Sequence, residues 1–500
     1  MKFFKAKFLI LAVLFLLPLV VSCKTTPANT DDSDKNNNST ATTDSNDGEN
    51  VDIAETTEYI YPEDMDGGGE EFNIFTPTTT WFFYTSIVHD EMTGDVLDDA
   101  IYMRNRIIED KFNINLKETN SDIESFNAQL RKTVKAGDDS YDAAFSPMFR
   151  GATFSTMISE NIFYNLREIP TMNLDEKWWN QMINTGASLA GGEKLFFGGC
   201  DINIMTLQCL ECVFFNQDMM TNLGLDLPYN KVREGTWTFD EFNKYCKAGV
   251  QLNGADSFKW DAGANSVYGF ISYDNSVNAL LDGSGEQYVT VETDGTLKLA
   301  VEGERFVNVL TKIQEMLVVQ DGTYLFANTA PDFHYEPLFQ NGRALMTMGE
   351  IKAADVFKAM ETTFGIVPIP KYNEIQEDYY CHNIFATPLT VIPSSNARPD
   401  FAGAVLDAMA YLSNKDVTPV FFDKTVSQKR LRNDDSIEML EIIKDASCID
   451  IGLVYGISSD FYEAIRHSLG EGKSFDIASQ TEKHKEKMNI NIDKLMDILN

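Results

Sequence analysis

Two cysteines, Cys209 and Cys212, have the C-x-x-C spacing that can chelate a metal ion or exchange disulfides. They stand at the start of a predicted strand, where residues three apart point to opposite faces of the sheet. This placement argues against chelation, and the strand-helix-strand setting of a redox motif is missing. We therefore interpret both as buried, apolar side chains. Six thiols could pair in an exported compartment: these two and Cys200, Cys246, Cys381 and Cys448.

Other motifs of catalysis or metal binding are absent or incomplete in the sequence. The chain has no H-E-x-x-H, G-x-S-x-G or G-x-G-x-x-G motif. Gly472-Lys473-Ser474 resembles the end of a phosphate-binding loop, but His467 occupies the position of its first glycine. No pair among the five histidines has metal-ligand spacing, so we expect each at the surface or satisfied in the core. We predict no catalytic residue, no metal and no cofactor.

Alternating strand and helix patterns begin near Phe72 and would position any site. We predict strands over 72–75, 114–118 and 141–145, separated by helices over 95–112 and 121–136. This alternation is typical of a doubly wound α/β sheet. Ligands of such sheets bind beyond the carboxyl ends of the strands, which here are followed by residues 76–84, 119–122 and 146–150. From Pro399 onward the pattern is mainly helical.

The first 23 residues have the pattern of an export signal. Lys2, Lys5 and Lys7 precede an apolar stretch over 8–21, which is short for a membrane span of about 20 residues. Val20-Val21-Ser22-Cys23 then resembles the lipobox of bacterial lipoproteins, in which the cysteine is lipidated. We predict a signal peptide over 1–22, lipidation at Cys23 and a disordered, polar tether over 23–69.

Composition limits the partners. The 500 residues include 41 Lys and Arg against 76 Asp and Glu, a formal net charge of −35. Such a chain repels nucleic acid, whose binding needs basic side chains that displace counterions. The length favours more than one domain, and 12 % aromatic residues can build a large core.

A series of short motifs, in order along the chain, resembles the extracellular solute-binding lipoproteins of ABC transporters, in the broad family 1-like group that includes sugar-binding proteins. The resemblance covers residues 70–500 and depends on motif order, since each motif alone is weakly specific. The motifs are 141–144 (YDAA), 175–181 (DEKWWNQ), 213–218 (VFFNQD), 235–242 (GTWTFDEF), 339–345 (FQNGRAL) and 365–372 (GIVPIPKY).

The resemblance implies an α/β fold of the periplasmic-binding-protein-like type II class: two α/β lobes, a hinge and a ligand cleft between the lobes. By that analogy we expect one lobe over 70–203 plus 349–395 and the other over 204–348 plus 396–500. It further implies capture of a solute by hinge closure and delivery to a permease.

Sugar ligands offer flat apolar ring faces and a rim of hydroxyl groups, which aromatic and polar side chains bind, respectively. Trp81 and Tyr84 follow the first predicted strand, and of the pair Trp178-Trp179 we expect Trp179 to face the cleft. The ligand-binding residues that we predict are Trp81, Tyr84, Phe149, Arg150, Trp179, Asp201, Asn203, Trp260, Glu350 and Tyr455.

We therefore expect a bacterial, lipid-anchored protein on the outer face of the cytoplasmic membrane or the cell surface. It would be a monomer that binds a small-molecule solute, most plausibly a carbohydrate or oligosaccharide, and an ABC permease, with membrane contact through lipid alone. One alternative is a surface enzyme or adhesion lipoprotein acting on glycans. Another keeps the fold but binds a peptide or other organic solute.

Overall fold

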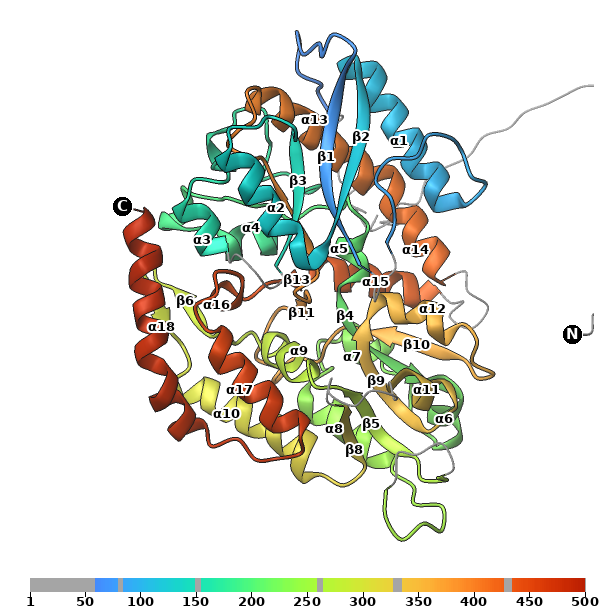
Figure 1. The fold of residues 1–500 in the computed structure, drawn as a ribbon. Helices are drawn as coiled ribbons and strands as arrows, with labels where there is room; N and C mark the ends of the chain where they lie inside the picture. Colours follow the sequence, from blue (N-terminus) through green and yellow to red (C-terminus); the bar gives the residue numbers. More distant parts are fainter. Residues whose placement is uncertain are drawn as a thin grey trace, which may run out of the picture. The chain divides into compact units, whose positions relative to one another are not determined.

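Two β-sheets, one of four strands and one of five, organise the chain (Figure 1). The computed structural model describes residues 59–79, 84–148, 154–258, 264–326, 335–426 and 434–499. All of these belong to one compact unit, Glu58–Asn500. We call the four-stranded sheet with its helices the first lobe, and the five-stranded sheet with its helices the second lobe.

The first lobe contains the strands predicted near the start of the globular chain. The strand order is β12-β3-β1-β2; β1 is parallel to β2 and β3, whereas β12 is antiparallel to β3. The strands are β1 (Glu70–Thr78), β2 (Ile114–Asp122), β3 (Ala143–Pro147) and β12 (Pro388–Val391). The helices are α1 (Val96–Phe112), α2 (Ile123–Lys135), α3 (Phe154–Ser159), α4 (Gln181–Ala187), α5 (Met205–Gln208), α13 (Pro399–Leu412) and α14 (Thr418–Val426). The helix α15 (Asp434–Asp445) follows α14 and packs against both α14 and the five-stranded sheet.

Local capping signals set the helix boundaries of this lobe. The Asp95 carboxylate accepts a hydrogen bond from the amide of Leu97 at 2.9 Å and begins α1. Asn113, with φ 48°, ends α1 in the left-handed region. The helix α2 begins at the Asp122 cap rather than at Ser121, because Ser121 is still paired with Pro77 in the sheet.

The second lobe has a mixed sheet in the order β10-β4-β9-β5-β8. Strand β5 is parallel to β8 and to the central strand β9, whereas β4 is antiparallel to β9 and β10. The strands are β4 (Glu211–Asn216), β5 (Tyr268–Tyr273), β8 (Thr323–Phe326), β9 (Ala344–Glu350) and β10 (Phe364–Val367), with a separate hairpin of β6 (Val289–Val291) and β7 (Leu297–Leu299). The helices are α6 (Gln217–Asn222), α7 (Tyr229–Arg233), α8 (Phe239–Ala248), α9 (Ser276–Gly283), α10 (Glu304–Gln314), α11 (Tyr335–Gln340), α12 (Ala354–Phe357), α16 (Ile451–Val454), α17 (Ser459–Gly470) and α18 (Ile477–Leu499).

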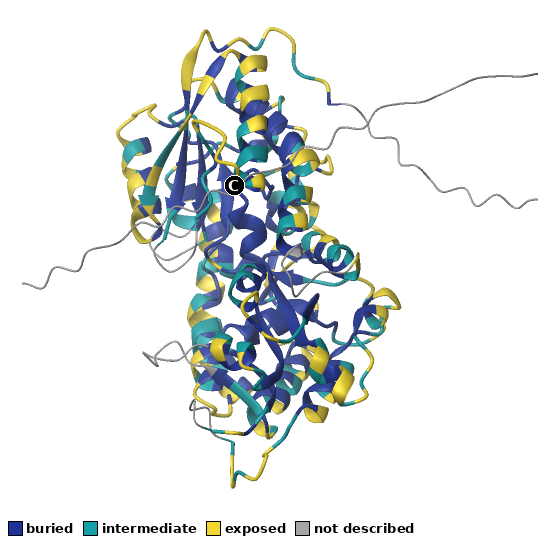
Figure 2. Ribbon diagram, turned by 90° about the vertical axis from the view of Figure 1, so that its right-hand side faces the viewer, coloured by how far each residue is buried: buried dark blue, intermediate teal, exposed yellow. Residues whose placement is uncertain are grey.

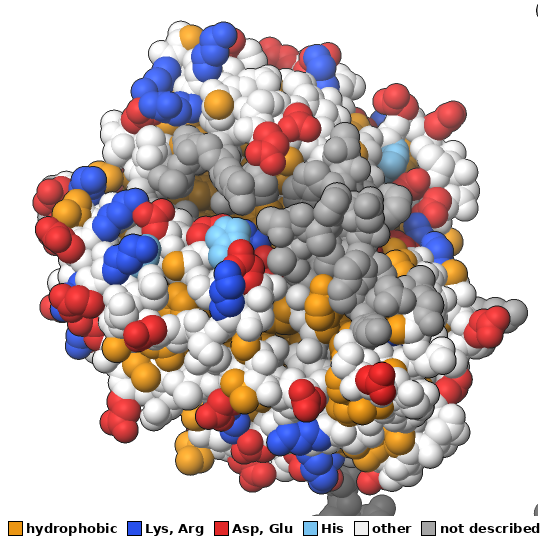
Figure 3. Space-filling view, turned by 60° about the horizontal axis from the view of Figure 1, so that its bottom comes forward, with side chains coloured by type: hydrophobic (Ala, Val, Ile, Leu, Met, Phe, Trp, Pro, Cys, Tyr) orange, Lys and Arg blue, Asp and Glu red, His pale blue; other side chains and the backbone are white. Residues whose placement is uncertain are grey.

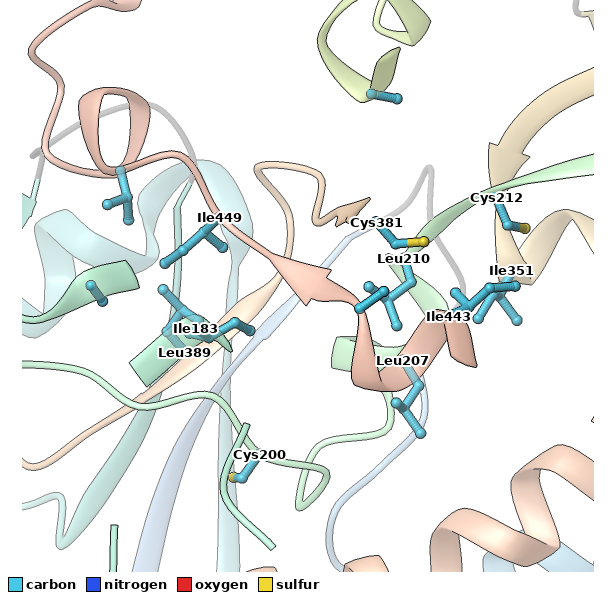
Figure 4. Close-up of a cluster of buried hydrophobic side chains, with 14 of the residues drawn as sticks. Ile183, Cys200, Leu207, Leu210, Cys212, Ile351, Cys381, Leu389, Ile443 and Ile449 are labelled. Carbon is cyan, nitrogen blue, oxygen red and sulfur yellow. The ribbon is translucent and has the colours of Figure 1, made fainter. Parts of the chain in front are cut away.

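Three segments carry the chain between the lobes, and they are hydrogen-bonded to one another. The first crossing is Cys209-Leu210, the second is β11 (Cys381–His382) and the third is β13 (Ser447–Cys448). The strands β11 and β13 pair in parallel, and Leu210 bridges to Asn383. Figure 4 shows the hydrophobic side chains around this region in two groups: Ile183, Leu389 and Ile449 in one, and Leu207, Leu210, Cys212, Ile351, Cys381 and Ile443 in the other.

These crossings correct the lobe boundaries predicted from the sequence. The first crossing follows residue 204 by only five residues, close to the expectation. The second and third crossings lie at residues 381 and 447 instead of near residues 348 and 395. Residues 349–380 stay in the second lobe because β10 returns to pair with β4. Most of 396–446 belongs to the first lobe, since α13 packs against α1.

Helices cover both sheets, so the strands are mostly buried. In Figure 2 the strands are mostly dark blue, and exposed residues gather on the outer sides of helices and in loops. One continuous hydrophobic cluster includes Phe72 and Phe75 of the first sheet and Phe214 and Phe270 of the second. Across the ranges that the structure describes, no helix combines the length and hydrophobicity needed to cross a membrane.

Candidate functional site

The carboxyl ends of the parallel strands identify the candidate site. In the first lobe these are the ends of β1, β2 and β3, and in the second lobe the ends of β5, β8 and β9. Open α/β sheets bind ligands at this edge. Four of the predicted ligand residues, Trp81, Phe149, Arg150 and Trp260, lie outside the described residues, as does the predicted lipidation site Cys23.

At the first-lobe edge, a buried threonine joins three polar side chains. The Thr76 hydroxyl lies 2.7 Å from Glu118 Oε1, 2.6 Å from Asn120 Oδ1 and 3.0 Å from the Tyr84 hydroxyl. Tyr84 also donates to Asn120 Oδ1 at 2.9 Å. Tyr84 is partly exposed. Its hydroxyl is therefore fixed at the strand ends, and its role as a ligand contact stays a prediction.

Glu118 is anchored on its other side by backbone donors. Its Oε2 accepts hydrogen bonds from the amides of Ile87 and Val88 at 3.0 and 3.1 Å, and from the Ser86 hydroxyl. Burial raises the pKa of the Glu118 carboxyl, and these donors together with Thr76 partly oppose that rise. The edge therefore presents a positioned set of oxygen acceptors.

At the second-lobe edge, two glutamates lie directly opposite each other. Glu211, the first residue of β4, is the register partner of Glu350, the last residue of β9. Like charges at opposed positions of a sheet are destabilising. The Tyr273 hydroxyl bridges them, 2.7 Å from Glu211 Oε1 and 2.8 Å from Glu350 Oε1. Burial raises the pKa of both carboxyls, that of Glu211 to about 7.

Aromatic side chains surround this carboxyl pair. Tyr335 stacks on Tyr273 with ring centroids 5.6 Å apart. The Asn275 amide lies 3.3 Å from Glu211 Oε2, and Tyr462 from α17 donates to the Asn275 side-chain oxygen. Glu350 and Tyr273 are half-buried, whereas Glu211 is fully buried. Glu350 is thus the predicted ligand residue that the structure places at the strand ends with a partly accessible carboxyl.

A buried histidine lies behind the glutamates, on the second crossing. His382 Nδ1 is 2.6 Å from Asp282 Oδ2, and its Nε2 is 4.0 Å from Glu211 Oε2. Burial lowers the pKa of His382, but the charges of Asp282, Glu211 and Asp450 outweigh it, so the net shift is upward. We expected each histidine either at the surface or hydrogen-bonded in the core. His382 is buried and hydrogen-bonded, which confirms the expectation for this residue. In the described part of the chain, no group of three or more His, Cys, Asp or Glu side chains could hold a metal ion.

Trp179 does not face the cleft, contrary to the prediction. Its indole is 1 % exposed, and its Nε1 donates to Asp407 Oδ1 at 2.7 Å. Trp178 Nε1 donates to the same oxygen at 3.0 Å. The prediction assumed a helix or strand, in which adjacent side chains diverge. The two residues instead lie at a turn, closed by the Trp179 amide and the Glu176 carbonyl, and both indoles converge on one acceptor.

Three other predicted ligand residues are buried in structural contacts. Asp201 accepts from the Thr418 hydroxyl at 2.9 Å and lies 3.7 Å from Lys444 of α15. Asn203 is fully buried, and its side-chain oxygen accepts from the Met205 amide at the start of α5. Tyr455, 2 % exposed, packs on Phe197 of the first lobe and donates to the Ala187 carbonyl. The structure thus gives them packing and capping contacts, although Asp201 also lines a hollow of about 240 Å³ beside Trp178 and Trp179.

The six described cysteines, Cys200, Cys209, Cys212, Cys246, Cys381 and Cys448, are all buried and free. Burial raises the pKa of each thiol, which keeps it protonated. Among the described residues none forms a disulfide, and the apolar interpretation of Cys209 and Cys212 is confirmed.

Sequence reasoning missed the residues that organise the second-lobe edge. Tyr273 is the last residue of β5 and Asn275 follows two residues later, so the rule that ligands bind beyond strand ends applies to both. Glu211 was inconspicuous among 76 acidic residues. His382 could not be assigned without knowing where the chain crosses between the lobes.

Comparisons with known proteins extend this picture. No family model matches the chain, and no curated protein matches it in sequence. Solved structures do match. The cyclic alpha-maltosyl-1,6-maltose binding protein of Arthrobacter globiformis has a TM-score of 0.55 at 12 % identity, over 85 % of this chain and 99 % of that one.

Two further solved structures agree. An ABC substrate-binding protein of Listeria monocytogenes, in complex with cycloalternan, has a TM-score of 0.52 at 13 % identity over 86 % of this chain and 99 % of that one. An ABC transporter solute-binding protein of Agrobacterium radiobacter K84, in complex with ribitol, has a TM-score of 0.51 at 13 % identity over 85 % and 99 %. At such identity the likeness concerns the fold. The described chain therefore has the predicted α/β, periplasmic-binding-protein-like type II fold, with two lobes joined by a hinge.

Proposed function

We propose that this protein is an extracytoplasmic solute-binding protein that captures a carbohydrate between its lobes and delivers it to an ABC permease. The observation that carries the proposal is the two-lobed fold itself, shared over nearly the full length of several solute-binding structures. Capture would occur by hinge closure, because a ligand that contacts both lobes favours the closed arrangement. We propose no enzymatic step and no cofactor.

The chemistry of the two strand-end edges supports a polyhydroxyl ligand. Glu118, Asn120 and Glu350 supply oxygen acceptors, and Tyr84, Tyr273 and Tyr335 supply aromatic faces and hydroxyls. Sugar rings need both kinds of group. The similar structures were solved with cycloalternan and ribitol, among other ligands. Trp81, Tyr84, Phe149, Arg150, Trp260 and Glu350 remain our proposed ligand contacts.

The location of the protein is part of the same proposal. Lipidation at Cys23 would hold the protein on the outer face of a bacterial membrane, and the polar residues that follow would serve as a tether. We propose a monomer whose only membrane contact is lipid and which binds no nucleic acid. Among the described side chains on the face seen in Figure 3, acidic and basic ones are interspersed, whereas nucleic acid needs a concentration of basic side chains.

A glycan-hydrolysing enzyme is the main alternative, and the glutamate pair is its best candidate site. Glu211 and Glu350 both contact one tyrosine hydroxyl, so their carboxyls are close enough for a retaining mechanism. However, Glu211 is fully buried behind Tyr273. A nucleophile must reach the sugar carbon, and this carboxyl has no access to a ligand in the cleft.

A thermal-shift screen of the full chain in detergent tests the function. The probes are maltotetraose, raffinose, ribitol, a tripeptide and spermidine. A ligand present at 100 times its Kd stabilises the native state by about 2.7 kcal/mol, so a saccharide should raise Tm clearly. A response to the tripeptide or spermidine alone would favour another solute, and release of reducing sugar would favour the enzyme.

Two variants locate the site and the anchor. Glu350→Gln should weaken saccharide binding roughly tenfold or more, since hydrogen bonds to charged groups contribute about 1.5–3 kcal/mol. Glu304→Gln, an exposed residue in the first turn of α10, is the matched control. Cys23→Ala should move the protein from the membrane fraction to the soluble fraction, and retention in the membrane would contradict lipid anchoring.

A further inference from the structure

Each crossing between the lobes brings one buried titratable side chain to the hinge. Glu211 directly follows the first crossing, His382 lies on the second, and Asp450 closely follows the third. Asp282, near the end of α9, completes the set. We call these four residues the hinge cluster. All four are at most 6 % exposed.

Direct contacts join His382, Asp282 and Glu211, and Asp450 interacts with Asp282 and His382 through its charge. His382 Nδ1 lies 2.6 Å from Asp282 Oδ2, its Nε2 lies 4.0 Å from Glu211 Oε2, and Asn278 approaches Nδ1 at 3.1 Å. Asp450 accepts hydrogen bonds from the amides of Tyr288 and Leu453 at 2.7 and 2.9 Å. The histidine therefore contacts one carboxyl from α9 and faces one at the start of β4.

The charged groups that face His382 are all acidic. Asp282 comes from α9, Glu211 from β4, Glu350 from β9, and Asp450 from the segment after β13. The Cys448 thiol and the Tyr288 phenol on neighbouring segments have raised pKa values through burial and stay neutral. One imidazolium cannot neutralise four carboxylates, so the arrangement is favourable only while some carboxyls hold protons.

Protons can reach the hinge cluster from solvent. Asp282 lines a hollow of about 470 Å³ beside β13, whose other walls include Thr185 of α4, Gln287 and Tyr380. From Asp282 the contacts run through His382 to Glu211 and then through the Tyr273 hydroxyl to Glu350. The hollow lies between α4 of the first lobe and α9 of the second, beside the third crossing.

We propose that His382 is a positioning residue of the candidate site, and that proton gain or loss by the hinge cluster tightens or loosens the three crossings. The effect on solute capture rests on the proposed function, whereas the response of the crossings rests on the fold alone. Lobe rotation must be absorbed in these segments. At acidic pH, protonated carboxyls do not repel one another. At alkaline pH, the deprotonated carboxylates repel one another in a buried environment.

Burial raises the pKa of both Glu211 and Asp450 to about 7, so the change falls near neutral pH. On the acidic side the crossings hold Glu211 and Tyr273 in place, and with them Glu350 at the ligand edge. On the alkaline side the same residues lose that support. Solute capture should therefore be stronger below neutral pH than above it.

Native thiols report the state of the hinge without any ligand. Cys381 lies on the second crossing, and Cys246, equally buried, lies in α8 away from the crossings. The experiment measures the reaction of each thiol with 4,4′-dithiodipyridine in the full chain, relative to the same thiol in urea-unfolded protein. The ratio of the Cys381 rate to the Cys246 rate isolates local loosening, because global unfolding would expose both cysteines alike.

We expect this ratio to rise at least fivefold between pH 5.5 and pH 8.5 in the wild-type protein. In His382→Gln it should already be high at pH 5.5, because glutamine cannot carry the proton. His467→Gln, on the exposed face of α17, should behave as wild type. A ratio that is flat in the wild type overturns the proposal, even if His382→Gln fails to fold. An unchanged response in a folded His382→Gln overturns the role of the histidine.

Discussion

Two fully buried carboxyls, one in each lobe, differ in the donors that surround them. Asp407 in α13 of the first lobe accepts hydrogen bonds from both indoles, Trp178 and Trp179, and from the backbone and side-chain amides of Asn173. Among the described residues, Glu211 in the second lobe is hydrogen-bonded to the Tyr273 hydroxyl and the Asn275 amide, with His382 Nε2 at 4.0 Å, and it lies opposite Glu350.

The two carboxyls are equally buried, but they differ in the number of donors around them. We infer that burial supports structure at Asp407 and proton exchange at Glu211. Four N–H donors replace the water that Asp407 loses on folding, so the carboxylate can fix the Trp178-Trp179 turn to α13. Glu211 has fewer donors and an acidic neighbour, and burial therefore raises its pKa to about 7. Donor count separates the two sites, since neither carboxyl is exposed.

Asp407→Ala should produce the largest effect. It leaves the two buried indole N–H groups of Trp178 and Trp179 without an acceptor, and each unsatisfied buried group costs about 1–3 kcal/mol. We expect the free energy of unfolding to fall by about 2–6 kcal/mol, measured by urea denaturation. Asp400→Ala, at the exposed start of the same helix, is the control and should change stability by less than about 1 kcal/mol. Equal losses in the two variants would contradict the importance of the donors.

The wild-type protein should become less stable as the pH rises from 5 to 8. Glu211 and Asp450 have folded-state pKa values raised to about 7, so between their unfolded values and pH 7 the folded chain holds more protons. The stability that they contribute is therefore present at low pH and lost as the pH rises. The pKa of His382 is also raised, so its contribution is lost in the same direction.

Urea denaturation at several pH values measures this slope, and we expect a total loss on the order of 3 kcal/mol. Carboxyls with lowered pKa values, such as Glu160 beside Arg131, titrate at more acidic pH and leave this window unaffected. Glu211→Gln should make the change of unfolding free energy with pH shallower, because up to one proton fewer is released. A stability that rises between pH 5 and pH 8 would contradict a raised pKa at Glu211 and Asp450.

Tyr273→Phe should have a smaller effect that depends on pH. The variant removes the hydroxyl between Glu211 and Glu350, which costs about 1–3 kcal/mol at pH 8, above the pKa of about 7 of Glu211. At pH 5 the cost should be lower, because a protonated carboxyl can donate to its neighbour. Tyr324→Phe in β8 of the same sheet is the control, since burial alone acts on that hydroxyl. A cost independent of pH would contradict the shared role of Tyr273.

The first strands and helices of the globular chain could be predicted from the sequence, whereas the lobe boundaries could not. Hydrophobic periodicity located the first three strands and both helices between them, because that signal is local. The crossings could not be located in this way. Gly349-Glu350 looked like an exit from the lobe, yet β9 lies between β4 and β5, and only strand pairing reveals this.

The candidate site was predictable at the level of edges and less so at the level of residues. Tyr84 and Glu350 follow strands and lie at the expected edges. Trp179 and Tyr455 were chosen because large aromatic side chains suit ligand stacking, but the same property suits packing. Their indole and phenol groups found partners in Asp407 and the Ala187 carbonyl, which are far away in sequence. Such partners cannot be recognised before the chain is folded.

Tyr84→Phe should give the smallest effect and completes the comparison on the first-lobe side. It removes a partly exposed hydroxyl that contacts Asn120 and Thr76, neither of which titrates. We expect a loss of less than about 1 kcal/mol, nearly the same at pH 5 and pH 8. Tyr102→Phe, whose hydroxyl bonds to no described residue, is the control.

Since an aromatic stack contributes about 0.5–1.5 kcal/mol beyond its buried area, Tyr84→Ala should weaken maltotetraose binding while Tyr84→Phe retains it. A pH-dependent loss in Tyr84→Phe would mean that Glu118 shares its proton with this edge, as Glu211 does across the hinge.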